Sequence, residues 1–157
     1  FNKGIRPALN VGISVSRVGS SAQTKAMKKV SGKIRLELAQ FRELEAFMQF
    51  AGDLDAETKA RIESGRRYTE LLKQNQHATL PFYKQVISIF AANAGILEGA
   101  PVSNVRAIEH EFLSLIERDA PQIMNRIETG KTLEDETAKE LEAMIVTFKN
   151  SYSSLYA

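Results

Sequence analysis

The stretch MKKVSGKIRLELAQFRELEAFM, residues 27–48, decides the fold class of this chain of 157 residues. Its apolar positions recur every three or four residues: Met27, Val30, Ile34, Leu38, Phe41, Leu44 and Met48. This spacing lays one apolar stripe along a helix, which we expect to run from about Gln23 to Phe50. Gly32 interrupts the stripe and predicts a weak or bent point.

Helix signals continue along the rest of the chain and predict a mainly α protein. Serine, threonine and aspartate favour helix starts because their side chains accept hydrogen bonds from the first backbone amides, and proline suits the first turn. We expect a bundle of about five to six helices, with a loop over residues 95–101. The expected starts are Asp53 or Asp55, Thr79 with Pro81, Ser103, Pro121, and Thr132 with Asp135 as a capping box.

Residues 4–18 show the only strand pattern. Aliphatic residues alternate with small or polar ones, and the aliphatic positions are Leu9, Val11, Ile13 and Val15. This period of two predicts a single β-strand in front of the helical bundle. Because one strand cannot pair with itself, we expect it either to dock against residues outside this chain or to lie unpaired on the helical body. The chain also begins on Phe1, so we expect it to be a piece of a longer protein.

The composition bounds the possible classes of protein. Hydrophobic residues make up 43% and charged residues 25%, which is ordinary for a globular domain and excludes a disordered chain. There is no cysteine, so disulfides, thiolate metal sites and cysteine nucleophiles are excluded. No apolar run approaches the ~18 residues of a membrane span.

The net charge of +2 is unevenly distributed. Residues 1–50 hold nine Lys or Arg and three Glu, which gives +6, and residues 51–157 hold twelve basic and sixteen acidic residues, which gives −4. The basic run consists of Lys25, Lys28, Lys29, Lys33 and Arg35. Such a run suits nucleic acid or an acidic protein, but a solvated helix face opposite the Met27–Met48 stripe is the favoured interpretation. A free-standing basic helical module is therefore the alternative function.

Known catalytic patterns are missing from the sequence. There is no GxxxxGK[ST] phosphate loop, and His77 and His110 have no His or Cys partner at ligand spacing. We expect His110 to be a solvated helix residue and the chain alone to be no enzyme. No metal site is expected.

The chain does, however, closely resemble a known family in its first half. Residues 3–19 read KGIRPALNVGISVSRVG, and the resemblance continues through residues 22–27, 38–44, 46–47, 50, 53–55 and 69–74. These segments resemble the alpha subunit of F-type ATP synthase. The resemblance implies that residues 1–22 end a nucleotide-binding domain and that residues 23–157 form a C-terminal helical domain.

The resemblance implies a catalytic role for Arg17. In the family the matching arginine reaches across the subunit interface to the phosphates of a nucleotide held by the neighbouring beta subunit. A guanidinium suits this role because it stays charged and presents a planar fork to the phosphate oxygens. The residue matching Ser14 lies in a region needed for activity. From the residues alone, a surface arginine and a packing serine remain open alternatives.

The resemblance also implies a second nucleotide contact. Residues matching Arg6, Pro7, Gln74 and Gln76 surround the adenine of a nucleotide that the alpha subunit binds without turning it over. Proline offers a base an apolar surface, and glutamine amides can donate and accept at its edge. The sequence HATL at residues 77–80 departs from the Tyr-Ser-Pro-Met common in the family. We expect the isolated chain to bind ATP weakly or not at all.

The partners and the location follow from the same resemblance. We expect beta subunits in an alternating ring, the central-stalk gamma subunit and the peripheral-stalk delta subunit, with ATP or ADP and magnesium in the whole complex. We expect neither nucleic acid nor direct membrane insertion. The complex would be peripheral to a membrane, on the cytoplasmic face of a bacterial inner membrane or on the matrix or stroma side in an organelle. A pure assembly scaffold, in which Arg17 is dispensable, is a third possibility.

Overall fold

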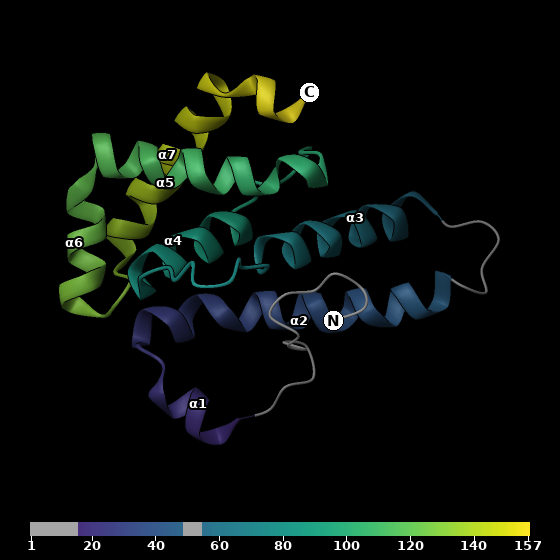
Figure 1. The fold of residues 1–157 in the computed structure, drawn as a ribbon, viewed down its shortest axis with the longest axis horizontal. Helices are drawn as coiled ribbons and strands as arrows, with labels where there is room; N and C mark the ends of the chain where they lie inside the picture. Colours follow the sequence, from purple (N-terminus) through teal and green to yellow (C-terminus); the bar gives the residue numbers. More distant parts are fainter. Residues whose placement is uncertain (1–15, 49–54) are drawn as a thin grey trace.

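The structure, a computed structural model, describes residues 16–48 and 55–157. Within these ranges the chain forms seven α-helices and two short 3-10 helices, and no strand (Figure 1). The elements are α1 (Arg17–Ala22), α2 (Lys25–Met48), α3 (Ala56–Leu71), α4 (Phe82–Asn93), η1 (Val102–Asn104), α5 (Val105–Asp119), α6 (Pro121–Gly130), α7 (Asp135–Ser151) and η2 (Ser153–Tyr156). The mainly α class is confirmed.

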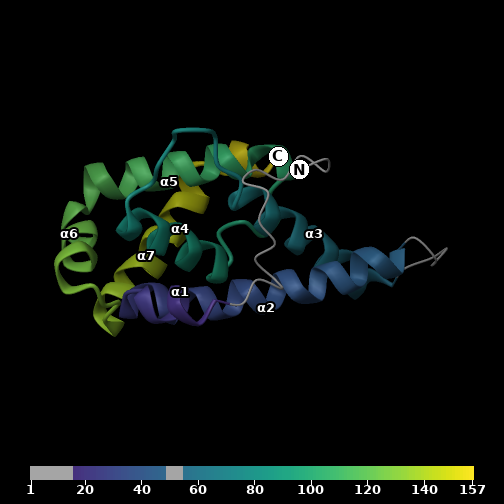
Figure 2. The same ribbon diagram turned by 60° about the horizontal axis from the view of Figure 1, so that its bottom comes forward.

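The helices form a bundle with α4 at its centre. α4 contacts α2, α5, α6 and α7, and it is the apolar sequence FYKQVISIFAAN. α2 and α3 lie side by side and extend together beyond the rest of the bundle (Figure 2). α6 closes the opposite end (Figure 1). Helices that are far apart in the sequence therefore pack against the same central helix.

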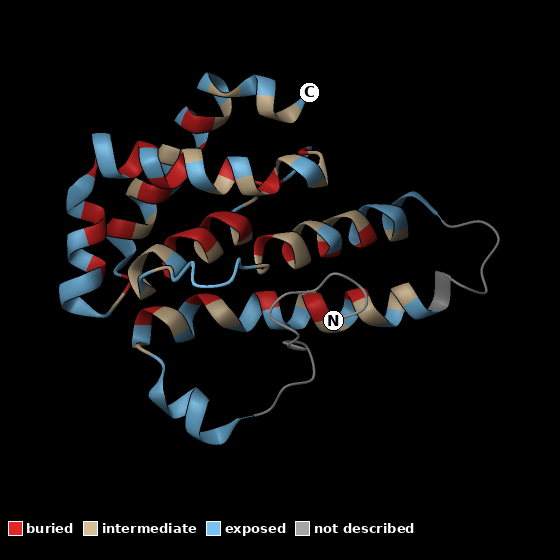
Figure 3. Ribbon diagram, in the orientation of Figure 1, coloured by how far each residue is buried: buried red, intermediate tan, exposed pale blue. Residues whose placement is uncertain are grey.

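The apolar stripe on α2 faces the bundle as expected. Val30, Ile34, Leu38 and Phe41 are buried, and Met27 packs against the core while partly exposed (Figure 3). α2 runs without a break through Gly32, so the predicted interruption is absent. Burying a side chain of this size stabilises the fold by about 1.5–3 kcal/mol relative to leaving it exposed.

A close approach between α2 and α3 depends on Gly65. A Cβ atom placed on Gly65 would lie 2.2 Å from Cγ of Phe41, far inside van der Waals contact. The missing side chain lets the Phe41 ring lie against the α3 backbone. Gly65 is buried. No pattern in the sequence around Gly65 predicted this contact.

The core behind α4 is formed by α5, α6 and α7. The Phe112 and Phe148 rings meet edge to face with their centres 5.4 Å apart, and the Tyr152 ring stacks on Phe148 at 4.6 Å. Such pairs add about 0.5–1.5 kcal/mol to the effect of burial. The largest fully buried side chains are Phe112, Phe148, Ile87, Ile108, Ile116, Ile123, Ile127, Leu141, Val86 and Val105.

The predicted strand is wrong where it can be checked. Arg17 and Val18, its last two expected residues, begin helix α1 instead. The Ser16 hydroxyl accepts a hydrogen bond from the Gly19 amide at 2.9 Å, and this cap favours a helix start over an extended chain. The rest of the expected strand, residues 4–15, lies outside the described residues.

The helix starts are confirmed in part. Asp55 caps α3, because its carboxylate accepts from the Thr58 amide at 2.7 Å, and Pro121 begins α6. The prediction of helix caps at Thr79, Ser103 and Thr132 is wrong. The helices α4, α5 and α7 begin later, and none of them has a side-chain cap. The reasons are local: Pro81 alone starts α4, η1 precedes α5, and α7 opens on two acidic residues that suit its positive end.

We predict opposite effects for alanine at two helical glycines. Gly65→Ala should lower the free energy of unfolding by about 1–3 kcal/mol, because the new methyl group overlaps the Phe41 ring. Gly32→Ala should raise it by about 0.5–1 kcal/mol, because nothing lies within 4 Å of a Cβ there and alanine favours the helix. Urea unfolding of both variants measures the difference; equal effects would contradict the close approach.

Candidate functional site

Arg17 stands on an exposed helix at the start of the described chain. α1 buries none of its six residues and lies apart from the body (Figures 1 and 3). Arg17 is its first residue, next to the Ser16 cap, and its carbonyl accepts from the Ser21 hydroxyl at 3.0 Å. The guanidinium is therefore presented outward from a short helix and not from a strand end. Arg6, Pro7 and Ser14 lie outside the described residues.

Gln74 and Gln76 lie together in the α3–α4 loop, residues 72–81. Gln74 is exposed, and its Nε2 donates to the Ala78 carbonyl across the loop. The Ala78 amide donates to the Asn75 carbonyl at 3.2 Å, which closes a tight turn. His77 adopts a left-handed φ of 62°, which a histidine tolerates better than a β-branched residue. These bonds give the loop a definite shape, and both Gln74 and Gln76 are exposed on it.

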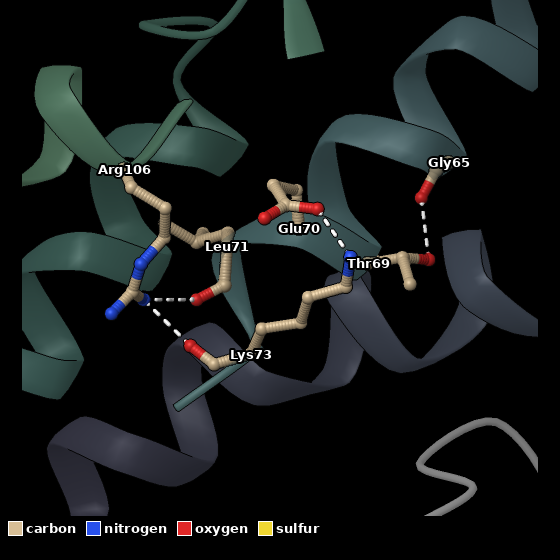
Figure 4. Close-up of polar contacts among 6 residues, drawn as sticks. All are labelled: Gly65, Thr69, Glu70, Leu71, Lys73 and Arg106. Carbon is tan, nitrogen blue, oxygen red and sulfur yellow. Dashed lines mark hydrogen bonds and ion pairs between the residues drawn. The ribbon is translucent and has the colours of Figure 1, made fainter. Parts of the chain in front are cut away.

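Arg106 of α5 binds the beginning of this loop (Figure 4). Its Nη1 donates to the Lys73 carbonyl at 2.7 Å, and Leu71 O lies 3.4 Å away. The last carbonyls of a helix have no partner within the helix, so a cation there satisfies them and opposes the negative end of the dipole. Lys73 itself pairs with Glu70 at 2.6 Å. Sequence analysis missed Arg106, because its partner lies 33 residues away.

Glu109 accepts from the same guanidinium nitrogen of Arg106, Nη1. The two side chains are 3.1 Å apart on one face of α5, and that of Glu109 is only 13% exposed. Burial raises the pKa of Glu109, although Ser88 and Arg106 beside it act in the opposite direction. Glu109 also lines a cavity of about 10 Å³ with Leu71, Ser88 and Phe112. This cavity is far too small for a nucleotide.

Two members of the basic run are bound to the bundle. The Lys29 ammonium donates to the Leu133 carbonyl and to Asp135, both at 2.9 Å, and lowers the pKa of that carboxyl. The Lys33 ammonium donates to the Asn93 carbonyl at 2.8 Å, while the Asn93 amide donates to Val30 O. Lys25 and Lys28 are exposed. The run is therefore partly structural, which weakens the case for a nucleic-acid surface.

His110 and the side chains that could bind a metal form no cluster in the described part of the chain. His110 is 78% exposed, as expected, with Glu111 at 3.5 Å. No three His, Cys, Asp or Glu side chains among the described residues come together as a metal site would require. Of the helices described, none has the length and hydropathy needed to cross a membrane.

Comparison with known protein families decides the affiliation of this helical body. The family described as "ATP synthase alpha/beta chain, C terminal domain" matches residues 23–148. The chain belongs to this family. Residues 23–148 include α2 to α6 and most of α7, so the ATP synthase alpha/beta family accounts for nearly all of the described fold.

Individual relatives point to one branch of the family. The chain is 53% identical over 152 residues to ATP synthase subunit alpha of Rhodococcus opacus (strain B4), covering 97% of this chain and 28% of that protein. It is 50% identical to subunit alpha of Mycobacterium avium (strain 104) over 98% of this chain and 28% of the relative. It is 49% identical to subunit alpha of Aquifex aeolicus (strain VF5) over 97% of this chain and 30% of that protein. The chain thus spans less than a third of the length of these relatives.

We predict that Lys33 stabilises the bundle and that Lys28 does not. Lys33→Met should lower the free energy of unfolding by about 0.5–1 kcal/mol, because a charged hydrogen bond to the end of α4 is lost. Lys28→Met, at another exposed lysine of the same helix, is the control and should change little. Urea unfolding compares them, and equal losses would mean that the Lys33 contact contributes nothing.

We predict a pH-dependent contribution from Glu109. Its pKa in the folded chain is raised above the ordinary 4.5, so the unfolded chain loses this proton first as the pH rises. The free energy of unfolding should therefore fall between pH 4.5 and the raised pKa, relative to the Glu109→Gln variant. Urea unfolding of both proteins from pH 4 to 7.5 measures this difference. Parallel curves would show that Glu109 titrates normally.

Proposed function

We propose that this chain is the carboxyl-terminal part of the alpha subunit of a rotary, proton-translocating ATP synthase. The supporting observation is about 50% identity to alpha subunits over nearly the whole chain. In this proposal residues 1–22 end the nucleotide-binding domain and residues 23–157 form the C-terminal helical domain. The chain has no phosphate loop of its own, so its role is to complete sites and not to form one alone.

Arg17 is proposed to act in trans on the catalytic nucleotide of a neighbouring beta subunit. Phosphoryl transfer spreads negative charge over the phosphate oxygens, and magnesium, when bound with the nucleotide, neutralises part of it. A guanidinium adds fixed positive charge without exchanging a proton. The exposed position of Arg17 at the tip of a capped helix fits such a role. Ser14, three residues earlier, is proposed to support the same interface.

The α3–α4 loop is proposed to contact adenine at the non-catalytic site, together with Arg6 and Pro7. The edge of adenine presents a donor amine beside ring-nitrogen acceptors. The Gln74 Oε1 can accept from that amine while its Nε2 stays bound to Ala78, and the exposed Gln76 amide can donate. The residues present therefore fit the base, even though residues 77–80 depart from the family pattern.

The proposed partners are the beta subunits of an alternating ring, the central-stalk gamma subunit and the peripheral-stalk delta subunit. ATP or ADP with magnesium would be bound by the whole complex. As part of such a complex the chain would lie at the membrane surface, on the cytoplasmic side in a bacterium or on the matrix or stroma side in an organelle.

We predict that Arg17 is needed for catalysis by the complete complex. Arg17→Ala should lower steady-state ATP hydrolysis by about a thousandfold or more, as loss of such an arginine does in other nucleotide hydrolases. Arg17→Lys should also be strongly impaired, because an ammonium cannot reproduce the fork. Hydrolysis rates of the purified complex measure the effect.

Arg118→Ala is the matched control for this experiment. Arg118 is also exposed, and it pairs with the adjacent Asp119 at 2.6 Å. Its removal should leave hydrolysis unchanged. Wild-type rates in both Arg17 variants would reject the catalytic role and favour a scaffold function for the chain.

A further inference from the structure

We propose that Arg106 is a positioning residue for base recognition at the non-catalytic nucleotide site. It contacts no nucleotide in this proposal, which rests on the proposed adenine contact of Gln74 and Gln76. It sets the direction in which the α3–α4 loop leaves α3, and so determines where both glutamine amides lie.

The contact is made at the peptide group that introduces the loop. The Lys73 carbonyl, which accepts from Arg106 at 2.7 Å, belongs to the peptide bond between Lys73 and Gln74 (Figure 4). A hydrogen bond to that oxygen restrains the peptide plane, and therefore the backbone from which Gln74 projects. The second carbonyl, Leu71 O, lies within 3.4 Å of the same nitrogen.

Two further bonds carry this restraint through the loop. Gln74 Nε2 donates to Ala78 O, which ties the start of the loop to its middle. Gln85 Nε2 donates to Leu80 O at 2.6 Å, which ties its end to α4. Gln76 lies within the first of these ties, in the turn closed by Asn75 and Ala78. A shift at Lys73 would therefore move both glutamines together.

Arg106 is itself held on a rigid support. Its neighbours on α5, Val105 and Ile108, are fully buried, and Glu109 binds the guanidinium at 3.1 Å. Three acceptors converge on one nitrogen, Nη1. The Nη1 atom carries two N–H donors and a lysine ammonium carries three, both from one point, so lysine can replace this arginine in part, unlike at Arg17.

The test measures ATP and GTP binding by the complete alpha subunit, using equilibrium dialysis, for Arg106→Met and Arg106→Lys. Arg106→Met should weaken ATP binding by ~10-fold and leave GTP binding nearly unchanged, because a lost hydrogen bond displaces only the base-reading amides. Arg106→Lys should keep most of the preference for ATP over GTP. Amide hydrogen exchange of residues 74–78 without nucleotide should be faster in Arg106→Met than in the wild type.

Controls separate this proposal from the function on which it rests. Arg126→Met removes a similar arginine, which is on α6 and pairs with Glu140 of α7 at 2.7 Å, and should change neither affinity. If the double variant Gln74→Ala with Gln76→Ala loses the ATP preference but Arg106→Met keeps it, the positioning role is overturned and the adenine contact stands. If the double variant keeps the preference, both are overturned. An equal loss of ATP and GTP binding in Arg106→Met would mean a general defect and also overturns the positioning role.

Discussion

The contact between the Phe41 ring and the backbone of Gly65 sets the distance between α2 and α3. With these helices close together, the stripe of α2 can cover α3 and α4 at the same time, as their shared contacts require. Interiors are packed to near-crystalline density, so a single methyl group at that point would be felt along both helices. The long basic helix becomes one wall of the bundle through this one contact.

Side chains that reach backbone carbonyls hold the ends of the helices in place. Arg67 Nε donates to Ala100 O at 2.6 Å, Tyr156 OH donates to Ile96 O at 2.7 Å, and Asn104 Nδ2 donates to Leu155 O at 2.9 Å. Burial raises the pKa of Tyr156 to about 12, so this hydroxyl keeps its proton at neutral pH. Arg106 of α5 likewise donates to backbone carbonyls, at the end of α3. Of the residues proposed to contact nucleotide, Gln74 and Gln76 thus lie on a loop and Arg17 lies on an exposed helix.

Part of the candidate site could be predicted from the sequence and part could not. The resemblance to a known family pointed to Gln74 and Gln76, but no sequence pattern revealed the bond from Gln74 to Ala78. Arg17 was expected at the end of a strand, and a local Ser16 cap placed it in a helix instead. Lys29 and Lys33 looked like solvated charges, although both donate to carbonyls of distant segments. Arg106 and Glu109 carried no local signal, because their effect depends on a helix end 33 residues away.

The sequence by itself determined the helical class, the buried face of α2, the start of α3 at Asp53 or Asp55 and the absence of a phosphate loop. These properties follow from spacing and residue type along a few turns of the chain, where physical chemistry acts locally. Only the tertiary structure decided which glycine permits helix contact, which lysines are bound, and which arginine directs the α3–α4 loop. These contacts join atoms from distant positions in the sequence. No local sequence pattern predicts which distant positions folding brings together.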